Sequence, residues 1–135
     1  MDEIAINKIH SSLLHMKVEE LTFDGGMPFF NFGKCKLFIA CSWRLVDGGD
    51  IVAGSVFSEK EEEEIRTTIL NLLQGKSILD VSVQPPFHDL KIEVSEGTLL
   101  EIFANSGRYE NWNYIGSEHK ADMIIAGPGL LWSAF

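Results

Sequence analysis

Val18-Glu19-Glu20-Leu21-Thr22-Phe23 reads like Ile78-Leu79-Asp80-Val81-Ser82-Val83, at an offset of 60. Further matches follow in the same order at offsets of 63, 69 and 73: Leu37 and Ile39 with Leu100 and Ile102, Trp43 with Trp112, and Ile51-Val52-Ala53-Gly54 with Ile124-Ile125-Ala126-Gly127. The order is kept and the offset grows only by loop-sized insertions. The sequence therefore predicts two β-rich units built on one plan, at about residues 17–56 and 77–129.

A helix is predicted between the two units. Ser58 is followed three residues later by Glu61, which forms a capping box. Glu59 and the run from Glu61 to Glu64 lie where the positive end of the helix dipole favours anions, so we interpret this acidic run as a solvated first turn rather than a metal or calcium site. Apolar residues at helical spacing follow, and Gly75 supplies the stop. The pattern predicts one long amphipathic helix over about residues 59–74, with its apolar stripe at Ile65, Ile69, Leu72 and Leu73.

A short amphipathic helix is predicted at the N-terminus, over residues 3–15. Ile6, Ile9, Leu13 and Met16 recur at spacings of three and four, and Asp2 can cap the start. The expected order of elements is thus a short helix, a β-meander, the long helix and a second β-meander. We predict an α+β fold of mainly antiparallel strands, with the long helix laid across a sheet face and all 135 residues in a single domain.

Alternation of apolar and polar residues predicts the individual strands. The longest runs from Cys35 to Leu45, and both of its faces are partly apolar, which favours a central strand. The other predicted strands are 18–23, 29–32, 51–56, 77–83, 90–94, 100–103, 111–115 and 123–126. Gly127-Pro128-Gly129 is expected to end regular structure. The apolar tail from Leu130 to Phe135 is expected to pack on the domain or on a second copy, which would make a homodimer.

Composition and charge exclude several classes of protein. Hydrophobic residues make up 45% of the chain and charged residues 23%, which is typical of a folded core. The net charge of −9 disfavours nucleic-acid binding, which depends on Lys and Arg, and suits a soluble protein or one that meets a basic partner. No apolar run approaches the roughly 18 residues of a membrane span, and the first residues lack the pattern of a signal peptide. We expect a soluble cytoplasmic protein that does not insert into a membrane.

The two cysteines are not expected to form a disulfide or a metal site. Cys35 and Cys41 lie six residues apart on the predicted long strand, which would separate them by about 20 Å. No Cys-x-x-Cys pair or nearby histidine accompanies them. We interpret both as small buried hydrophobic residues.

No catalytic, metal or cofactor motif is present. The chain lacks the Gly-x-Ser-x-Gly elbow and the glycine-rich phosphate loops, and the spacing of its histidines, His10, His15, His88 and His119, does not predict a metal site. Glu110, with His88 and Asp89, could serve as a general acid or base only inside a pocket that shifts its pKa. We predict no catalytic residue, no metal ligand and no cofactor.

Two polar–aromatic segments are the predicted binding residues. Ser42-Trp43-Arg44 ends the long strand, and Arg108-Tyr109-Glu110-Asn111-Trp112 occupies the matching place in the second unit. Aromatic residues and arginine are the usual anchors of protein interfaces. The predicted contacts are Trp43, Arg44, Tyr109, Glu110 and Trp112. The alternative is that both tryptophans are core residues, with Arg44 or Glu110 in a structural ion pair.

A resemblance accompanies these segments. It is carried by Cys41-Ser42-Trp43-Arg44-Leu45, Ile51-Val52-Ala53-Gly54-Ser55, Pro86-Phe87-His88-Asp89-Leu90, Tyr109-Glu110-Asn111-Trp112 and Ala126-Gly127-Pro128-Gly129. Over roughly residues 17–129, the chain resembles a family of small uncharacterised bacterial proteins, domains of unknown function, some of them similar in size and acidity to immunity proteins of toxin systems. The resemblance implies a cytoplasmic bacterial protein that inhibits a co-encoded toxin, and it supplies no active site.

Two hypotheses of function follow. The first is a non-enzymatic protein-binding module, such as an immunity-type inhibitor whose acidic surface steers a basic toxin domain. The second is a small-molecule-binding protein or enzyme with a cleft between the two β units. A pocket lined by Trp43 and Trp112, with Glu110 or His88 inside, would favour the second. A flat acidic surface would favour the first.

Overall fold

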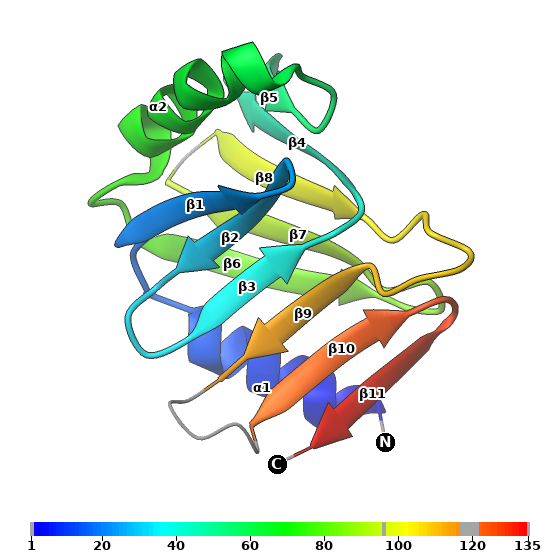
Figure 1. Cartoon of the computed structure of the whole chain (residues 1–135). Helices are drawn as coiled ribbons and strands as arrows, with labels where there is room; N and C mark the ends of the chain where they lie inside the picture. Colours follow the sequence, from blue (N-terminus) through cyan, green and yellow to red (C-terminus); the bar gives the residue numbers. More distant parts are fainter. Residues whose placement is uncertain (1, 96, 117–121, 135) are drawn as a thin grey trace.

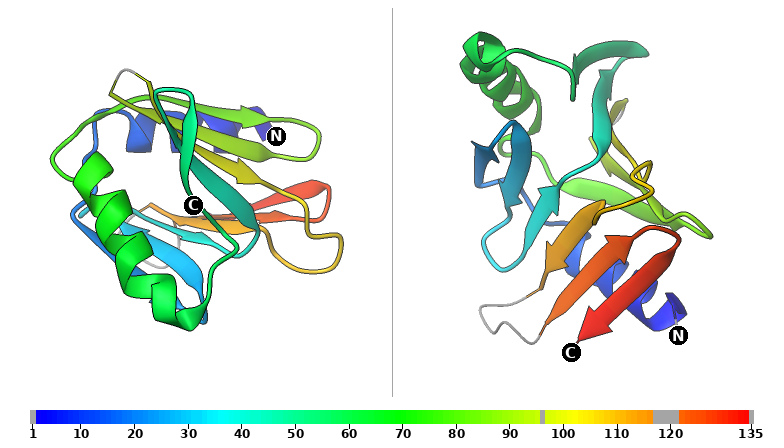
Figure 2. Two further views of the ribbon diagram at one scale, coloured as in Figure 1. Left: turned by 90° about the horizontal axis from the view of Figure 1, so that it is seen from above. Right: turned by 45° about the vertical axis from the view of Figure 1, so that its right-hand side comes forward.

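The computed structural model describes residues 2–95, 97–116 and 122–134. Within these residues the chain forms 11 strands and two α-helices, and the strands make two antiparallel sheets (Figure 1). The predicted α+β class with antiparallel strands is confirmed. The two sheets lie as separate layers, which the left view of Figure 2 shows from above.

Each sheet combines strands from both halves of the sequence. The six-stranded sheet has, in spatial order, β1 (Glu20–Asp24), β2 (Met27–Asn31), β3 (Lys36–Ile39), β9 (Trp112–Ile115), β10 (Met123–Gly127) and β11 (Leu130–Ala134). The five-stranded sheet has β5 (Asp50–Gly54), β4 (Ser42–Asp47), β8 (Thr98–Phe103), β7 (Asp89–Val94) and β6 (Ile78–Gln84). The central pairings, β3 with β9 and β4 with β8, join the two halves.

The predicted long strand from Cys35 to Leu45 is wrong, because it is two strands in two different sheets. β3 ends at Ile39, the chain crosses between the layers at Ala40 and Cys41, and β4 begins at Ser42. Every odd-numbered residue from 35 to 45 is nevertheless buried. The two sheets share one core, so inward-facing residues alternate without interruption while the strand leaves one layer for the other.

Both helices lie beside edge strands. α1 (Asp2–Leu13) packs against β6 and β11, and α2 (Glu62–Leu73) packs against β1 and β5, so each helix contacts an edge strand of both sheets. The helix predicted over 59–74 consists of a 3₁₀ turn (Glu59–Glu61) followed by the 12 residues of α2. It lies at the sheet edges and not, as predicted, across a sheet face. The backbone N–H and the hydroxyl of Ser58 donate to the Glu61 carboxylate, which lowers the pKa of Glu61.

Regular structure continues beyond Gly127-Pro128-Gly129, which corrects the expectation that it ends there. Pro128 and Gly129 form a two-residue turn, with Gly129 at a positive φ of 73°, and β11 returns along β10. The tail thus packs on its own domain as a strand, as far as Ala134. Phe135 lies outside the described residues, as does His119.

Within the described part of the chain, no helix is long and apolar enough to cross a membrane.

We expect substitution of Ile9 by Ala to lower the free energy of unfolding by about 2–5 kcal/mol, because its fully buried side chain would leave a cavity under α1. Ile4→Ala, on the exposed face of the same helix, should change this free energy by less than about 0.5 kcal/mol. Urea unfolding of the two variants measures both values. Equal effects would show that α1 does not depend on its buried stripe.

Candidate functional site

The two tryptophans of the predicted site are buried. Trp112 is 0% exposed and its indole N–H donates to the backbone oxygen of His88 at 2.8 Å. Trp43 is 3% exposed and its backbone N–H donates to the hydroxyl of Ser55. In this conformation neither indole is available to a partner, so their placement fits the alternative that both are core residues.

Arg44 lies on the outer face of the five-stranded sheet, in an ion-pair row. Its Nε donates to the Glu101 carboxylate at 2.8 Å, and its guanidinium stands 5.1 Å from the centre of the Phe103 ring. The Nζ of Lys91 lies 4.0 Å from the second oxygen of Glu101. The cross-strand register places Arg44, Glu101, Lys91 and Ser82 side by side across four strands. This row is polar, as on solvated antiparallel sheets, whereas the neighbouring outward pair Val46 and Leu99 is apolar.

Tyr109 and Glu110 lie in the loop between β8 and β9, over the opposite sheet from Arg44. They line a hollow of about 510 Å³ on the outer side of the six-stranded sheet, together with Met27, Phe38, Ala40, Arg108 and Pro128. Tyr109 is 71% exposed, and the Glu110 carboxylate accepts a hydrogen bond from the side chain of Asn113. The structure therefore brings Tyr109 and Glu110 together and separates them from the other three predicted residues.

Buried Asn111 holds this loop in place. Its side-chain oxygen accepts the N–H of Ser106 at 2.8 Å, its backbone N–H donates to Ala126, and its carbonyl accepts from Ala40. The hydroxyl of Ser106 in turn accepts the N–H of Tyr109 at 3.0 Å. Because a buried amide that loses such partners is costly, the loop is fixed to the sheet and Tyr109 is held outward.

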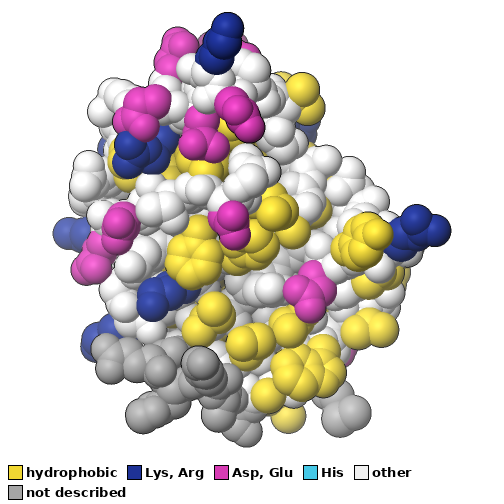
Figure 3. Space-filling model, viewed as in Figure 1, with side chains coloured by type: hydrophobic (Ala, Val, Ile, Leu, Met, Phe, Trp, Pro, Cys, Tyr) yellow, Lys and Arg dark blue, Asp and Glu magenta, His cyan; other side chains and the backbone are white. Residues whose placement is uncertain are grey.

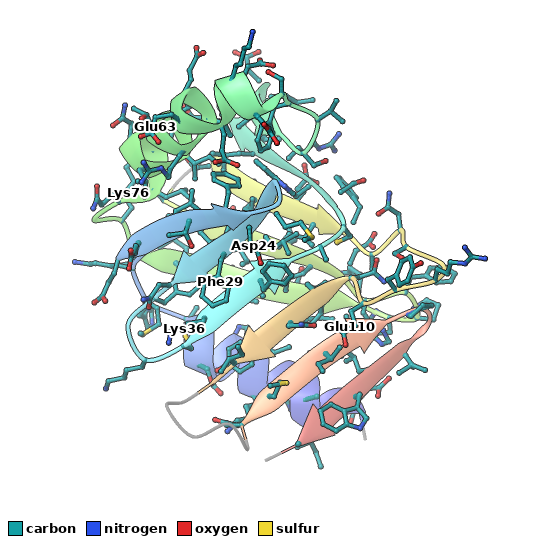
Figure 4. All side chains as sticks on the ribbon, viewed as in Figure 1. Asp24, Phe29, Lys36, Glu63, Lys76 and Glu110 are labelled. Atoms are coloured by element: carbon teal, nitrogen blue, oxygen red, sulfur yellow. The ribbon has the colours of Figure 1, made fainter. Side chains whose placement is uncertain are left out.

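The outer face of the six-stranded sheet is apolar, and sequence reasoning missed it. We define the outer row as the cross-strand partners Phe29, Phe38, Asn113, Ile125 and Trp132, which lie side by side from β2 to β11. Figure 3 shows hydrophobic side chains gathered on this face, and Figure 4 places Phe29 there with Asp24, Lys36 and Glu110 around it. The alternating apolar residues of β2, β3 and β10 are the sequence signal that could have found it.

Two further hollows adjoin the β1–β2 turn, Gly25-Gly26. One, of about 450 Å³, is lined by Trp43, Ser42, Phe57 and Asn105 among others. The second, of about 430 Å³, is lined by Phe23, Phe57, Glu59 and Glu62. Phe23 and Phe57 meet edge to face, with ring centres 5.5 Å apart. Neither of these hollows, nor the one at Tyr109, is lined by Trp112 or His88. None of the three therefore combines Trp43 and Trp112 with Glu110 or His88, the lining expected of a cleft between the two units.

The two cysteines are not activated nucleophiles. Cys35 and Cys41 are free thiols, and burial raises the pKa of Cys35 to about 11 and that of Cys41 to about 12. Both therefore stay protonated at neutral pH. Asp89 accepts the backbone N–H of Ala104, and buried His88 lies 3.4 Å from the carboxylate of Asp2. Among the described residues, no three His, Cys, Asp or Glu side chains gather closely enough to hold a metal ion.

No protein-family model matches this chain, and no curated protein or solved structure shows significant similarity to it.

We expect the free energy of unfolding to fall as the pH rises above about 9, because an exposed thiol in the unfolded chain ionises with a pKa of 9.0 while the folded thiols do not. Above pH 9 the unfolded chain binds fewer protons than the folded one. The thiols' contribution to the free energy of unfolding is therefore fully present below pH 9, and it is lost as the pH rises from 9 through the pKa values of the folded thiols. Tyr114, whose pKa burial raises to about 12, adds to the loss at higher pH.

Urea unfolding at about pH 8 and about pH 10 measures this loss. The double variant Cys35→Ala with Cys41→Ala is the control, and it should show a smaller decrease between the two pH values. An equal decrease in the variant would mean that the thiols do not cause it.

Proposed function

We propose that this protein is a non-enzymatic binding module that holds a basic partner protein on the outer face of its six-stranded sheet. The observation that carries the proposal is the outer row. Its members lie on the side of the sheet away from the core, yet Phe29, Phe38, Ile125 and Trp132 are apolar. An exposed apolar surface rimmed by polar residues is typical of a protein interface.

The other sheet serves as an internal comparison. The corresponding outward row of the five-stranded sheet is Arg44, Glu101, Lys91 and Ser82. Solubility alone would favour polar residues on both outer faces. The difference between these two rows supports a binding role for the six-stranded sheet, although the five-stranded sheet also has outward apolar residues, among them Val46 and Leu99. The ion pair with Glu101 supports a structural role for Arg44.

Charge supports a basic partner. The chain has a net charge of −9. Asp24 and Glu110 stand at the border of the apolar face, which Lys36 and Arg108 also flank (Figure 4). A net negative charge raises the rate at which a basic protein associates, and this effect weakens with salt. Tyr109, held outward beside Glu110, supplies an aromatic anchor of the kind found at interface hot spots.

An immunity-type inhibitor is the specific form of this proposal. The resemblance to small acidic bacterial proteins supports it, as does the placement of apolar and acidic residues on one surface. The partner would be a basic toxin domain made by the same bacterium, and the two proteins would meet in the cytoplasm. Inhibition would be steric, since the binding surface needs no catalytic group.

The shared plan of the two units is part of the proposal. Apart from β11, the two sheets have strand orders β1-β2-β3-β9-β10 and β6-β7-β8-β4-β5. In each, the first three strands of one unit are followed by the fourth and fifth strands of the other unit. Trp43 lies in β4 and Trp112 in β9, and Lys17 forms a bridge with Ser77, 60 residues further along. These correspondences support an internal repeat with a pseudo-two-fold axis, in which β11 is an addition to the second unit.

The hollow beside Trp43 favours a second candidate, a small-molecule-binding protein. At about 450 Å³ it is large enough for a metabolite, and Ser42 and Asn105 at its wall are hydrogen-bonded to each other, at 2.9 Å between the Asn105 amide nitrogen and the Ser42 hydroxyl. A ligand with polar groups could replace that bond. A thermal-shift screen of metabolites would detect such binding as a rise in Tm.

We expect the double variant Phe38→Ser with Tyr109→Ala to weaken binding of the partner about ten-fold or more, because both side chains line the hollow at the corner of the apolar face. The immobilised wild-type protein is used to capture proteins from native cell extract at low and at moderate salt. The partner is then purified and titrated against each variant.

The matched control is Ile51→Ser with Leu79→Ser, which removes two exposed apolar side chains from the five-stranded sheet. It should bind like the wild type. A captured protein supports the proposal only if it is basic, is released as salt rises and is lost in the Phe38–Tyr109 variant. A partner retained equally by both double variants would refute the assignment to this face.

A further inference from the structure

We propose that β11 pairs with β11 of a second copy of this chain, in antiparallel register about a two-fold axis beside Trp132. β11 is the last strand of the six-stranded sheet, and within the described residues it pairs on one side only, with β10. Two of its five side chains are exposed large hydrophobic groups, Leu130 at 55% and Trp132 at 50%. This proposal concerns the edge of the sheet. Trp132 also belongs to the outer row, so the tests below measure mass and cross-linking of this chain alone, without the partner bound on the face.

The hairpin geometry identifies the backbone groups that a second strand would bind. Gly127 and Leu130 flank a two-residue turn, so they form the hydrogen-bonded pair that closes it. Bonded and non-bonded pairs alternate along an antiparallel ladder, so Trp132 and Ala134 also direct their backbone groups toward β10. The N–H and C=O groups of Leu131 and Ser133 therefore point away from β10, along the open edge.

Charge distinguishes this edge from the other three. β1 carries Glu20 and Asp24, β5 carries Asp50, and β6 carries Asp80 beside an irregularity in its register. Charged side chains and bulges are the usual devices that prevent pairing at a sheet edge. The hairpin from Met123 to Ala134 contains no charged residue. β11 thus lacks the charged residues found on the other edge strands, and α1 contacts it as α2 contacts β1 and β5.

The same property indicates a second copy as the occupant. Two chains of net charge −9 repel each other, so a self-interface needs a segment where like charges do not meet. In a two-fold pairing of β11, every residue faces another residue of the same uncharged segment. At β1, the same symmetry would set Glu20 of one copy opposite Asp24 of the other.

Symmetry and hydrogen bonding together select one register. The backbone groups of Leu131 and Ser133 can bond only to residues of the other copy that also point outward. The pairing that meets this condition and uses all five residues of β11 sets Leu131 opposite Ser133, and Leu130 opposite Ala134. Four backbone hydrogen bonds then cross the axis. Trp132 lies opposite its own copy in the close, non-hydrogen-bonded position. The two six-stranded sheets become one continuous sheet, and the outer rows of both copies join.

Sedimentation over a wide range of protein concentration tests the dimer. The wild type should reach twice the monomer mass of 15.1 kDa. Ser133→Pro removes an outward N–H from each copy and leaves the pairing with β10 intact, so the dissociation constant should rise about ten-fold or more. Ser133→Ala keeps the N–H and should dimerise like the wild type. A wild type that stays monomeric, or a dimer unchanged by Ser133→Pro, would overturn the proposal.

Disulfide trapping tests the register independently. Trp132→Cys would place two new thiols opposite each other, within reach of a disulfide, and should give covalent dimers under mild oxidation. The native thiols are buried, so they should not contribute. Ile51→Cys, at an exposed position on the other sheet, is the control and should stay monomeric. Equal trapping of both variants would mean random collision rather than the proposed axis.

Discussion

The fold depends on one apolar layer that both sheets must share. β3 and β4 are joined by only Ala40 and Cys41, yet they belong to different sheets. The crossing succeeds because the odd-numbered residues from Cys35 to Leu45 stay buried on both sides of it. A shift of one residue at the crossing would turn the inward residues of one strand to solvent. The positions of the loops and of both outer faces follow from this register.

Local patterns in the sequence predicted most of the elements but not their assembly. The alternation of Leu90, Ile92 and Val94 predicted β7, and all three are buried. The capping box at Ser58 located the start of the second helix. Alternation gave no sign of the crossing at Ala40, because it continues through it. The strand β11 was missed, because Gly127-Pro128-Gly129 serves equally well as a stop and as a hairpin turn.

The candidate site shows a related limit. Sequence reasoning grouped the tryptophans with their polar neighbours, because aromatic and charged residues together resemble an interface. In the structure, this segment divides between core and surface. Asn111 and Trp112 are buried, while Tyr109 and Glu110 face outward. The apolar outer face draws its residues from β2, β3, β9, β10 and β11, so it becomes visible only when the strand order is known. Tyr109 and Glu110 lie in one loop, so the sequence alone could place them together.

The pairing of distant strands has a consequence for synthesis on the ribosome. Leu37 in β3 pairs with Tyr114, and Leu45 in β4 pairs with Leu100, so each takes its central neighbour from the second half of the chain. Until residues 98–115 emerge, the nascent N-terminal half has two open strand edges and half of an apolar layer. Such late contacts slow folding and expose surfaces that aggregate. The nascent chain therefore exposes the unpaired edges of β3 and β4 until β8 and β9 are made.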